Sequence, residues 1–311
     1  MSFLAKPTEV PRRHDHVNLR GAQRRALWVA LGLNAGFMVV ELMGGVLFHS
    51  LALLADAAHM LSDVAGLAIA LVAQYLMDRP FSARKTYGLQ RAEVLGAMAN
   101  GLTLVAVTVW IFVEAWGRLS DPETVAGSGV LAVGALGLAV NAGSAVVLVR
   151  SRGRSLNMHG AWLHMVSDAA GSVAVIVAAM GVLLWDAQWV DAAASIVIGI
   201  LILAVTWRLL VETVHVLMEG APRDVDVNAV QEAMEAEPGV ESVHHLHLWN
   251  LASDSAALSA HLVLERDTSL HDAQERGDRI KAMLSADFGI AHATLEFECH
   301  TCEPALADGH H

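Results

Sequence analysis

The chain has 311 residues, of which 55% are hydrophobic and only 17% are charged, and its net charge is −12. Soluble domains carry about 25% charged residues, so a soluble globular protein of ordinary composition is excluded. The mean hydropathy of +0.47 favours a protein that buries much of its apolar surface in a lipid bilayer. The acidic balance argues against nucleic acid as a partner.

Residues 1–24 are polar and basic, so we expect a cytoplasmic N-terminal segment without a cleaved signal peptide. Six apolar segments follow, each long enough to span a bilayer as a helix, which needs roughly 20 residues. They are Ala26–Leu47, Leu51–Met77, Val94–Trp116, Val125–Val149, Ala161–Trp185 and Val190–Leu210. The sequence therefore predicts an all-α, six-helix transmembrane domain over residues 25–217.

Lys and Arg residues are distributed unevenly among the connections between these segments. Six precede the first segment, four follow the second and three follow the fourth, whereas the opposite side carries only Arg118. By the positive-inside rule, both termini face the cytoplasm.

The part of the chain from Glu219 onward has 18 acidic and 5 basic residues, which gives it a charge of −13. We expect a separate cytoplasmic α+β domain over residues 218–304, followed by a short tail, 305–311. Asp224 or Asp226 is predicted to cap a first helix that ends near Glu235, because Pro238 and Gly239 follow. The remaining predicted elements are strands Val240–Leu251 and Ala256–Leu264, helix Leu270–Phe288 and strand Ala293–Cys299, in the order αββαβ.

Two of the apolar segments contain the same spacing, H-x-x-x-D, as His59 with Asp63 and as His164 with Asp168. Residues four apart lie on one face of a helix, so each helix presents one imidazole and one carboxylate. Two such pairs provide two nitrogen and two oxygen ligands, which suit tetrahedral Zn²⁺. A purely structural role in helix packing is the alternative, but ionisable residues within a membrane are costly and usually functional.

Asp56 lies about two helical turns before Asp63 on the same face. It either accepts a hydrogen bond from a ligating histidine, or belongs to a proton path, or serves only in helix packing, and the sequence leaves these roles open. Glu41 is expected to bond to another helix and has no predicted role in the site.

The order and spacing of motifs over about 250 residues resemble those of the cation diffusion facilitators, in particular bacterial zinc, cobalt and cadmium resistance exporters and vesicular zinc transporters. The motifs are SLALLADAAHMLSD, TYGLQRAE, SLNMHGAWLHMVSDAAGSVAV and EGAPRDVD…GVESVHHLHLW…LSAHLVLE. The resemblance implies a homodimer, a ferredoxin-like cytoplasmic domain and proton-coupled export of cytosolic zinc, with cadmium or cobalt as further substrates. It implies a multi-pass protein of a bacterial inner membrane.

The four residues His59, Asp63, His164 and Asp168 fall on the family's transport-site positions. Some bacterial members carry another zinc site after the second helix. This chain has Ser82, Lys85 and Leu89 there, so that site is expected to be absent.

Nine of the 16 histidines and both cysteines lie in the acidic tail. The C-x-x-C spacing of Cys299 and Cys302 suits a Zn²⁺ bound by two thiolates, and His244 and His261 could meet across a hairpin. By resemblance to the vesicular transporters, tail metal ligands are His244, His261, Glu298, Cys299 and Cys302. In those relatives a His-x-His stretch of the partner chain completes a site, and His14 and His16 have that form.

Two other classes of protein were considered. An intramembrane metalloenzyme needs a general base and an open metal position, as in H-E-x-x-H, and that motif does not occur. We therefore expect no enzyme. A membrane metal sensor or receptor that never transports remains the alternative function.

Overall fold

The computed structural model describes residues 32, 35–77, 86–150, 156–252, 255–266 and 268–300. Side chains are described over the same ranges, except at several positions of the second predicted helix and over 143–150 and 156–167. The chain divides into a helical unit, which extends to Leu71 and includes Asn100–Trp207, and a second unit of Val72–Ala99 and the chain from Arg208. Each unit is described by itself.

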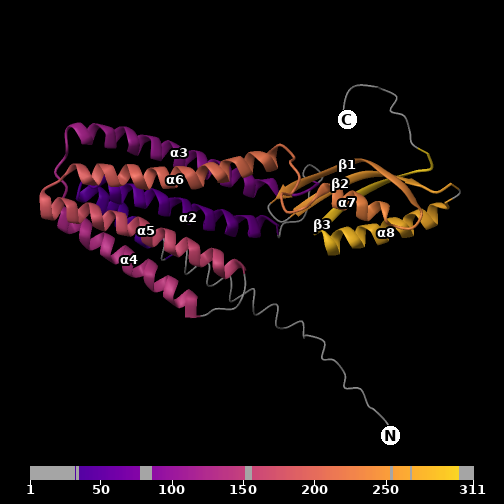
Figure 1. The fold of residues 1–311 in the computed structure, drawn as a ribbon, viewed down its shortest axis with the longest axis horizontal. Helices are drawn as coiled ribbons and strands as arrows, with labels where there is room; N and C mark the ends of the chain where they lie inside the picture. Colours follow the sequence, from indigo (N-terminus) through magenta and orange to yellow (C-terminus); the bar gives the residue numbers. More distant parts are fainter. Residues whose placement is uncertain are drawn as a thin grey trace, which may run out of the picture. The chain divides into compact units, whose positions relative to one another are not determined.

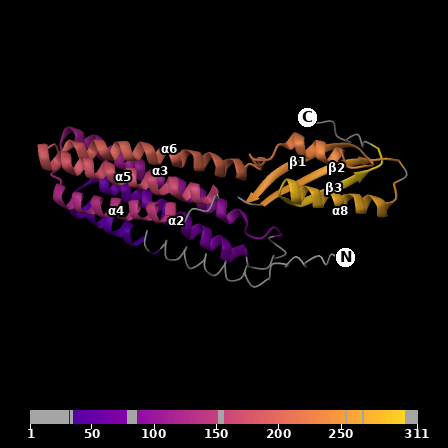
Figure 2. The same ribbon diagram turned by 60° about the horizontal axis from the view of Figure 1, so that its bottom comes forward.

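The helical unit is built from long apolar helices that lie alongside one another (Figures 1 and 2). They are the helix Ala35–Leu47, α2 (Leu51–Met77), α3 (Arg91–Ser120), α4 (Gly127–Arg150), α5 (Leu156–Trp185) and α6 (Trp189–Leu217). Residues 72–77 of α2, 91–99 of α3 and 208–217 of α6 belong to the second unit. The predicted bounds of α2 are confirmed. In contrast, α3, α5 and α6 begin before or end beyond their apolar segments, because polar residues such as Arg91 and His215 continue the helix.

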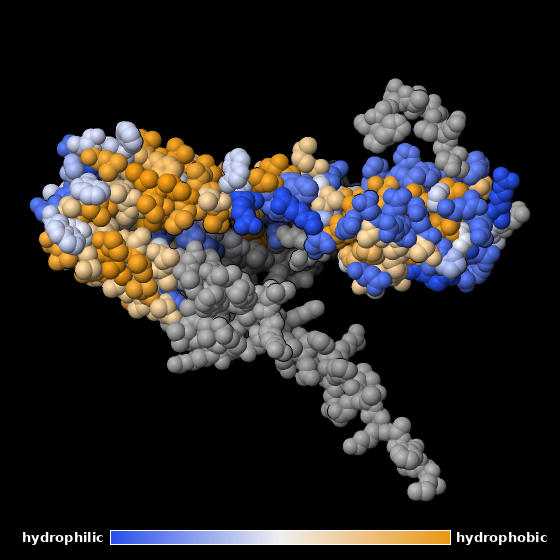
Figure 3. All heavy atoms as spheres, viewed as in Figure 1, coloured by the Kyte–Doolittle hydropathy of each residue, from blue (hydrophilic) through white to orange (hydrophobic). Residues whose placement is uncertain are grey.

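Within the described residues, three helices are long and apolar enough to cross a membrane: Arg91–Ser120, Asp168–Trp185 and Trp189–Leu217. The described parts of two more, Ala35–Leu47 and Gly127–Ala142, are apolar but shorter. Hydrophobic residues gather on the outside of this unit, whereas the surface of the second unit is mainly hydrophilic (Figure 3). An apolar exterior is typical of helices in contact with lipid.

Small residues dominate the interior of the helical unit. Ala52, Ala55 and Ala58 of α2 are at most 6% exposed and belong to the same core as Ala178 and Ala179 of α5. Small side chains let helix backbones approach closely, which is how helices associate where no water drives them together. The α2 and α5 backbones are thereby held close enough for short polar side chains to meet.

The second unit contains the predicted αββαβ elements in that order. They are α7 (Val227–Glu235), β1 (Val240–Ala252), β2 (Ser255–Leu264), α8 (Leu270–Asp287) and β3 (Ile290–Glu298). Asp226, rather than Asp224, caps α7 by accepting a hydrogen bond from the Asn228 amide. The predicted start of the last strand at Ala293 is wrong. Gly289 turns the chain at φ +68°, so pairing begins at once with Ile290.

The three strands form one sheet in the order β1-β2-β3, with β1 antiparallel and β3 parallel to β2. Alternate β2 residues Leu258, Ala260 and Leu262 are buried in a core shared with α7 and α8. Because side chains alternate between the faces of a strand, His261 points to the face without helices. Metal-ligating residue types on that face are therefore accessible.

Any side chain at position 277 of α8 is expected to destabilise the domain, because a Cβ added to Gly277 would lie 2.6 Å from Cζ of Phe297 in β3. Gly277→Ala should lower the stability of the domain by about 1–3 kcal/mol, the usual cost of overpacking. Hydrogen exchange of α8 amides in the full chain measures this. Ala282→Val, which adds volume at an exposed position of the same helix, is the control. Equal exchange rates in the two variants would contradict the packing argument.

Candidate metal centres

The helical unit brings together His59 and Asp63 of α2 with Asp168 of α5. The His59 Nε2 atom lies 3.2 Å from Asp168 Oδ1 and 4.0 Å from Asp63 Oδ2. One ligand atom from each of the three residues lies within 4.8 Å of the others. The side chains are 21%, 17% and 13% exposed, respectively, so the cluster is mostly enclosed but not sealed. One imidazole nitrogen and two carboxylate oxygens can converge on a single divalent cation.

His164, the fourth residue of the doubled motif, lies in α5 one turn before Asp168. Its side chain lies outside the described ones, so its participation stays a prediction. The structure thus brings together three of the four predicted residues, from two helices that are separated by about 100 residues in sequence.

Two further acidic side chains lie beside this cluster. Asp56 is 5% exposed and Glu41 is 1% exposed. Glu41 Oε2 is buried without a hydrogen-bond partner among the described residues. Glu41 was predicted to bond to another helix, but its proximity to the site was missed. The signal was a single carboxylate in an otherwise apolar segment.

Gly171 explains how α5 comes so close to Asp56. A Cβ atom at this position would lie 2.8 Å from Asp56 Oδ1. Gly171 lies three residues after Asp168, so the same stretch of α5 both supplies a carboxylate and leaves room for another.

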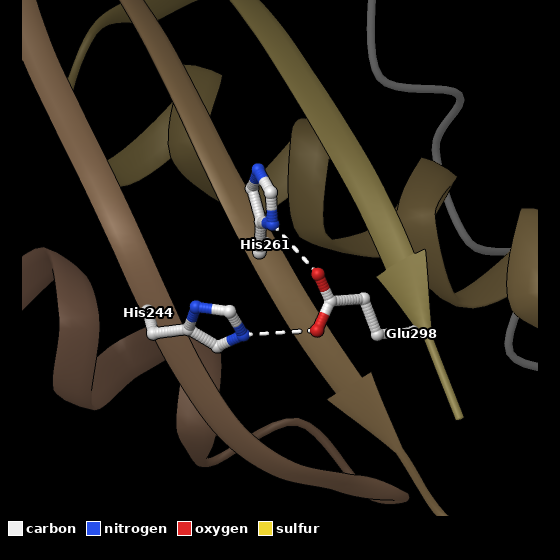
Figure 4. A group of neighbouring side chains, drawn as sticks. All are labelled: His244, His261 and Glu298. Carbon is white, nitrogen blue, oxygen red and sulfur yellow. Dashed lines mark hydrogen bonds and ion pairs between the residues drawn. The ribbon is translucent and has the colours of Figure 1, made fainter. Parts of the chain in front are cut away.

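The second unit holds a separate cluster on the helix-free face of its sheet (Figure 4). Glu298 at the end of β3 reaches both histidines: its Oε2 lies 3.0 Å from His244 Nε2, and its Oε1 lies 2.7 Å from His261 Nδ1. His244 and His261 are direct cross-strand partners, as predicted from a hairpin. One ligand atom from each of the three residues lies within 4.8 Å of the others, and all three side chains are partly buried. Two imidazoles and one carboxylate fit a zinc ion.

A β-bulge after His244 adds a third ring. His245 has a positive φ of 48°, and its ring centroid lies 5.1 Å from that of His244 and 5.2 Å from that of His261. His245 is not among the tail ligands that the sequence predicts. An adjacent H-H pair in a strand places its rings on opposite faces, and only the irregular backbone brings both to one side.

Of the remaining predicted tail ligands, the structure describes only Cys299, which is not part of this cluster. Cys299 is exposed, and its Sγ lies 3.2 Å from Nδ1 of His300. Cys302, His14 and His16 lie outside the described residues. Their part in metal binding therefore stays a prediction.

Comparison with known proteins identifies relatives over nearly the whole chain. A family model described as the cation efflux transmembrane domain matches residues 27–218, and one described as the cation efflux protein cytoplasmic domain matches residues 222–300. The metal cation efflux system protein CzcD of Cupriavidus metallidurans is 41% identical over 96% of this chain and 92% of that protein.

Two other relatives have comparable coverage. A cadmium, cobalt and zinc/H⁺-K⁺ antiporter of Bacillus velezensis is 37% identical over 92% of this chain and 91% of its own. The zinc transporter ZitB of Escherichia coli is 37% identical over 92% and 94%, respectively. Among solved structures, the metal-bound C-terminal domain of the CzcD transporter from C. metallidurans is 40% identical, with a TM-score of 0.22. It covers 24% of this chain and 99% of that domain.

Gly171→Ala is expected to disturb the contact between α2 and α5, because the added Cβ would lie 2.8 Å from Asp56 Oδ1. The helix or the carboxylate must shift, at a cost of about 1–3 kcal/mol, and the melting temperature of the purified protein in detergent should fall. Gly117→Ala in α3 is the matched control, since no described atom lies within 4 Å of its added Cβ. If Gly171→Ala melts at or above the temperature of that control, α5 does not depend on this close approach.

Proposed function

This chain belongs to the cation efflux family, and from that membership we propose that it is an antiporter that exports zinc from the cytoplasm in exchange for protons. Two relatives with 37% identity are named for cadmium, cobalt and zinc and for zinc, respectively, and cadmium and cobalt are proposed as further substrates. The family consists of transporters rather than enzymes, so no catalytic residue is assigned.

The observation that carries the proposal is the convergence of His59, Asp63 and Asp168 inside the helical unit. In a bilayer, ionisable groups away from the surface are retained at a cost of several kcal/mol and usually serve function. With His164 one turn from Asp168, the proposed site has two nitrogen and two oxygen ligands between α2 and α5. Imidazole ligands favour zinc over harder ions such as Mn²⁺, which prefer oxygen.

Proton coupling follows from the chemistry of the ligands. A histidine must be neutral to bind a metal, so a proton and the metal compete for His59 and His164. Zinc that enters from the cytoplasm displaces these protons, and protons that arrive from the other side displace zinc. The partial exposure of the cluster keeps it reachable from water, which allows release as well as binding.

The proposed membrane arrangement has six spanning helices and both termini in the cytoplasm of a bacterium. The Lys and Arg distribution supports this orientation. Trp116, Trp185 and Trp189 lie toward the ends of α3, α5 and α6 and are 74%, 74% and 54% exposed, as expected for an aromatic belt at the membrane surface. The match of residues 222–300 to the family's cytoplasmic domain supports a homodimer that associates through a ferredoxin-like tail.

The tail cluster is proposed as a regulatory zinc site. His244, His261 and Glu298 supply three ligands on one sheet face. Further ligands proposed for it are Cys299, Cys302, and His14 and His16 of the partner chain. A tail with a charge of −13 repels its copy, and bound zinc lowers that repulsion, so metal binding favours the dimer.

Asp168→Ala should abolish zinc transport, because it removes a carboxylate that lies 3.2 Å from His59. Even residues that only orient metal ligands contribute a factor of about 10–100 to affinity, so the loss of a ligand should reduce flux by at least about 100-fold. The measurement is zinc flux into sealed proteoliposomes with an imposed pH gradient. Asp121→Ala, which removes an exposed carboxylate outside the cluster, is the charge-matched control.

Wild-type flux from the Asp168→Ala variant would contradict the site. An absence of flux in the wild-type protein, together with retained zinc binding, would instead favour a metal sensor or receptor. Collapse of the pH gradient with an ionophore should lower wild-type flux, and no change would contradict proton exchange.

Glu298→Gln should lower the number of zinc ions bound per protomer by one, because the neutral amide cannot replace the carboxylate that both histidines contact. Transport should persist at least in part, since the ligands in the helical unit are unchanged. Elemental analysis of the purified dimer gives the stoichiometry. His271→Ala, at a side chain that is 81% exposed, is the control. A Cys299→Ser, Cys302→Ser double variant tests the thiolates, and equal stoichiometry there would remove them from the site.

A further inference from the structure

A buried carboxylate of α6 binds the first turn of α2, the helix that carries His59 and Asp63. Asp191 is 1% exposed. Its Oδ1 accepts a hydrogen bond from the Ser50 hydroxyl at 2.6 Å, and its Oδ2 accepts one from the Leu51 amide at 2.6 Å and another from Ala52 at 3.4 Å. The residues that meet here are about 140 positions apart in sequence, so this is a contact between helices.

The contact satisfies backbone groups that a helix cannot satisfy itself. The first N–H groups of a helix have no partner within it, and Leu51, Ala52 and Leu53 are fully buried, so water does not replace one. Asp191 accepts from the amides of Leu51 and Ala52, and the Ser50 hydroxyl accepts from that of Leu53 at 3.2 Å. All of these donors are neutral, and the positive end of the helix dipole compensates the carboxylate charge.

The turn that precedes α2 is fixed by other elements as well. His49 adopts a left-handed φ of 55°, and its carbonyl accepts a hydrogen bond from Arg118 of α3 at 2.7 Å. The Phe48 carbonyl accepts one from the Ala126 amide at 3.1 Å. The start of α2 is therefore attached to α3, to the segment before α4 and, through Asp191, to α6.

Asp191 also connects α2 to the helix that supplies Asp168. The α5 and α6 helices are joined by only three residues, 186–188, and Val190 packs where a side chain on Gly181 of α5 would stand. The carboxylate thus attaches α2 to an α5–α6 pair whose own connection is short. The position of His59 and Asp63 on α2 relative to Asp168 on α5 depends on this attachment.

The geometry of a helix shows how sensitive the metal cluster is to the attachment of α2. His59 lies nine residues after Ser50, about 13.5 Å along the helix. A slip of α2 by a single residue would move His59 by about 1.5 Å along the axis and turn it by about 100°. The distance of 3.2 Å between His59 Nε2 and Asp168 Oδ1 would not survive such a shift.

We propose that Asp191 is a positioning residue of the transport site: it fixes the height and rotation of α2 relative to α5 and α6, so that His59 and Asp63 face Asp168. Asp191 touches neither metal nor the ligands, and acts through the first turn of α2. This inference rests on the proposed function, because it assigns Asp191 to the transport site named there.

The test uses Asp191→Ala and Asp191→Asn in the full-length protein in proteoliposomes. Without the carboxylate, the KM for zinc should rise by at least about tenfold, as for other residues that orient metal ligands. The ratio of zinc to cadmium flux should change as well, because the spacing of the ligands changes. Loss of folded protein alone would lower both fluxes by one factor and leave their ratio and the KM unchanged.

Ser195→Ala is the matched control. Ser195 is fully buried one turn further along α6, and the hydrogen bond of its hydroxyl within the described part of the chain is to the Ala192 carbonyl of its own helix at 2.8 Å. This variant should keep the wild-type KM and flux ratio. Asp191→Glu, which retains the charge on a longer side chain, should recover part of the loss relative to Asp191→Ala.

An unchanged KM and flux ratio in Asp191→Ala would overturn the proposal, and so would a loss confined to the maximal rate. If Asp191→Ala does not insert into the membrane, the KM and flux ratio of Asp191→Asn test the positioning role in its place. Wild-type and Asp168→Ala protein in the same vesicles test the proposed function separately. Should their fluxes differ as expected while Asp191 variants behave as wild type, only the positioning role fails.

Discussion

Polar ligands inside an apolar helical unit must find all their partners in the protein, and the rest of this structure depends on that constraint. The contact between His59 of α2 and Asp168 of α5 exists only while the two helices keep one spacing and one rotation. Alanines in the interior and Gly171 of α5 set the spacing, because they bring the backbones close. The hydrogen bonds between Asp191 and the start of α2 restrict rotation and sliding.

The two clusters contain the same kinds of metal ligand, histidine and carboxylate, in different surroundings. In the helical unit, His59 and two carboxylates lie among apolar helices. Charges without a bound cation cost free energy in these surroundings, so protons replace a metal ion that leaves. On the sheet face, Glu298 joins two histidines that water can reach, and nothing there forces release. Similar ligands thus serve the proposed tasks of transport and regulation because their surroundings differ.

The sequence by itself determined the elements and the types of ligand. Runs of apolar residues placed the helices, since about 20 such residues are needed to cross a bilayer, and the αββαβ order followed from local periodicity. The doubled H-x-x-x-D spacing put one imidazole and one carboxylate on each of two helices, because helix geometry alone fixes which residues share a face. His244 and His261 were predicted as hairpin neighbours for the equivalent reason in strands, and they are direct partners.

Only the tertiary structure decided which of these residues meet. No local pattern indicates that Glu298 reaches both tail histidines while Cys299 stays exposed, or that a bulge turns His245 toward the same rings. Likewise, Asp191 looks like an ordinary acidic residue at the start of a helix until it is found beside Ser50, 141 positions away. Local periodicity fixes the direction of a side chain relative to its own element, whereas contacts between elements depend on packing over the whole chain.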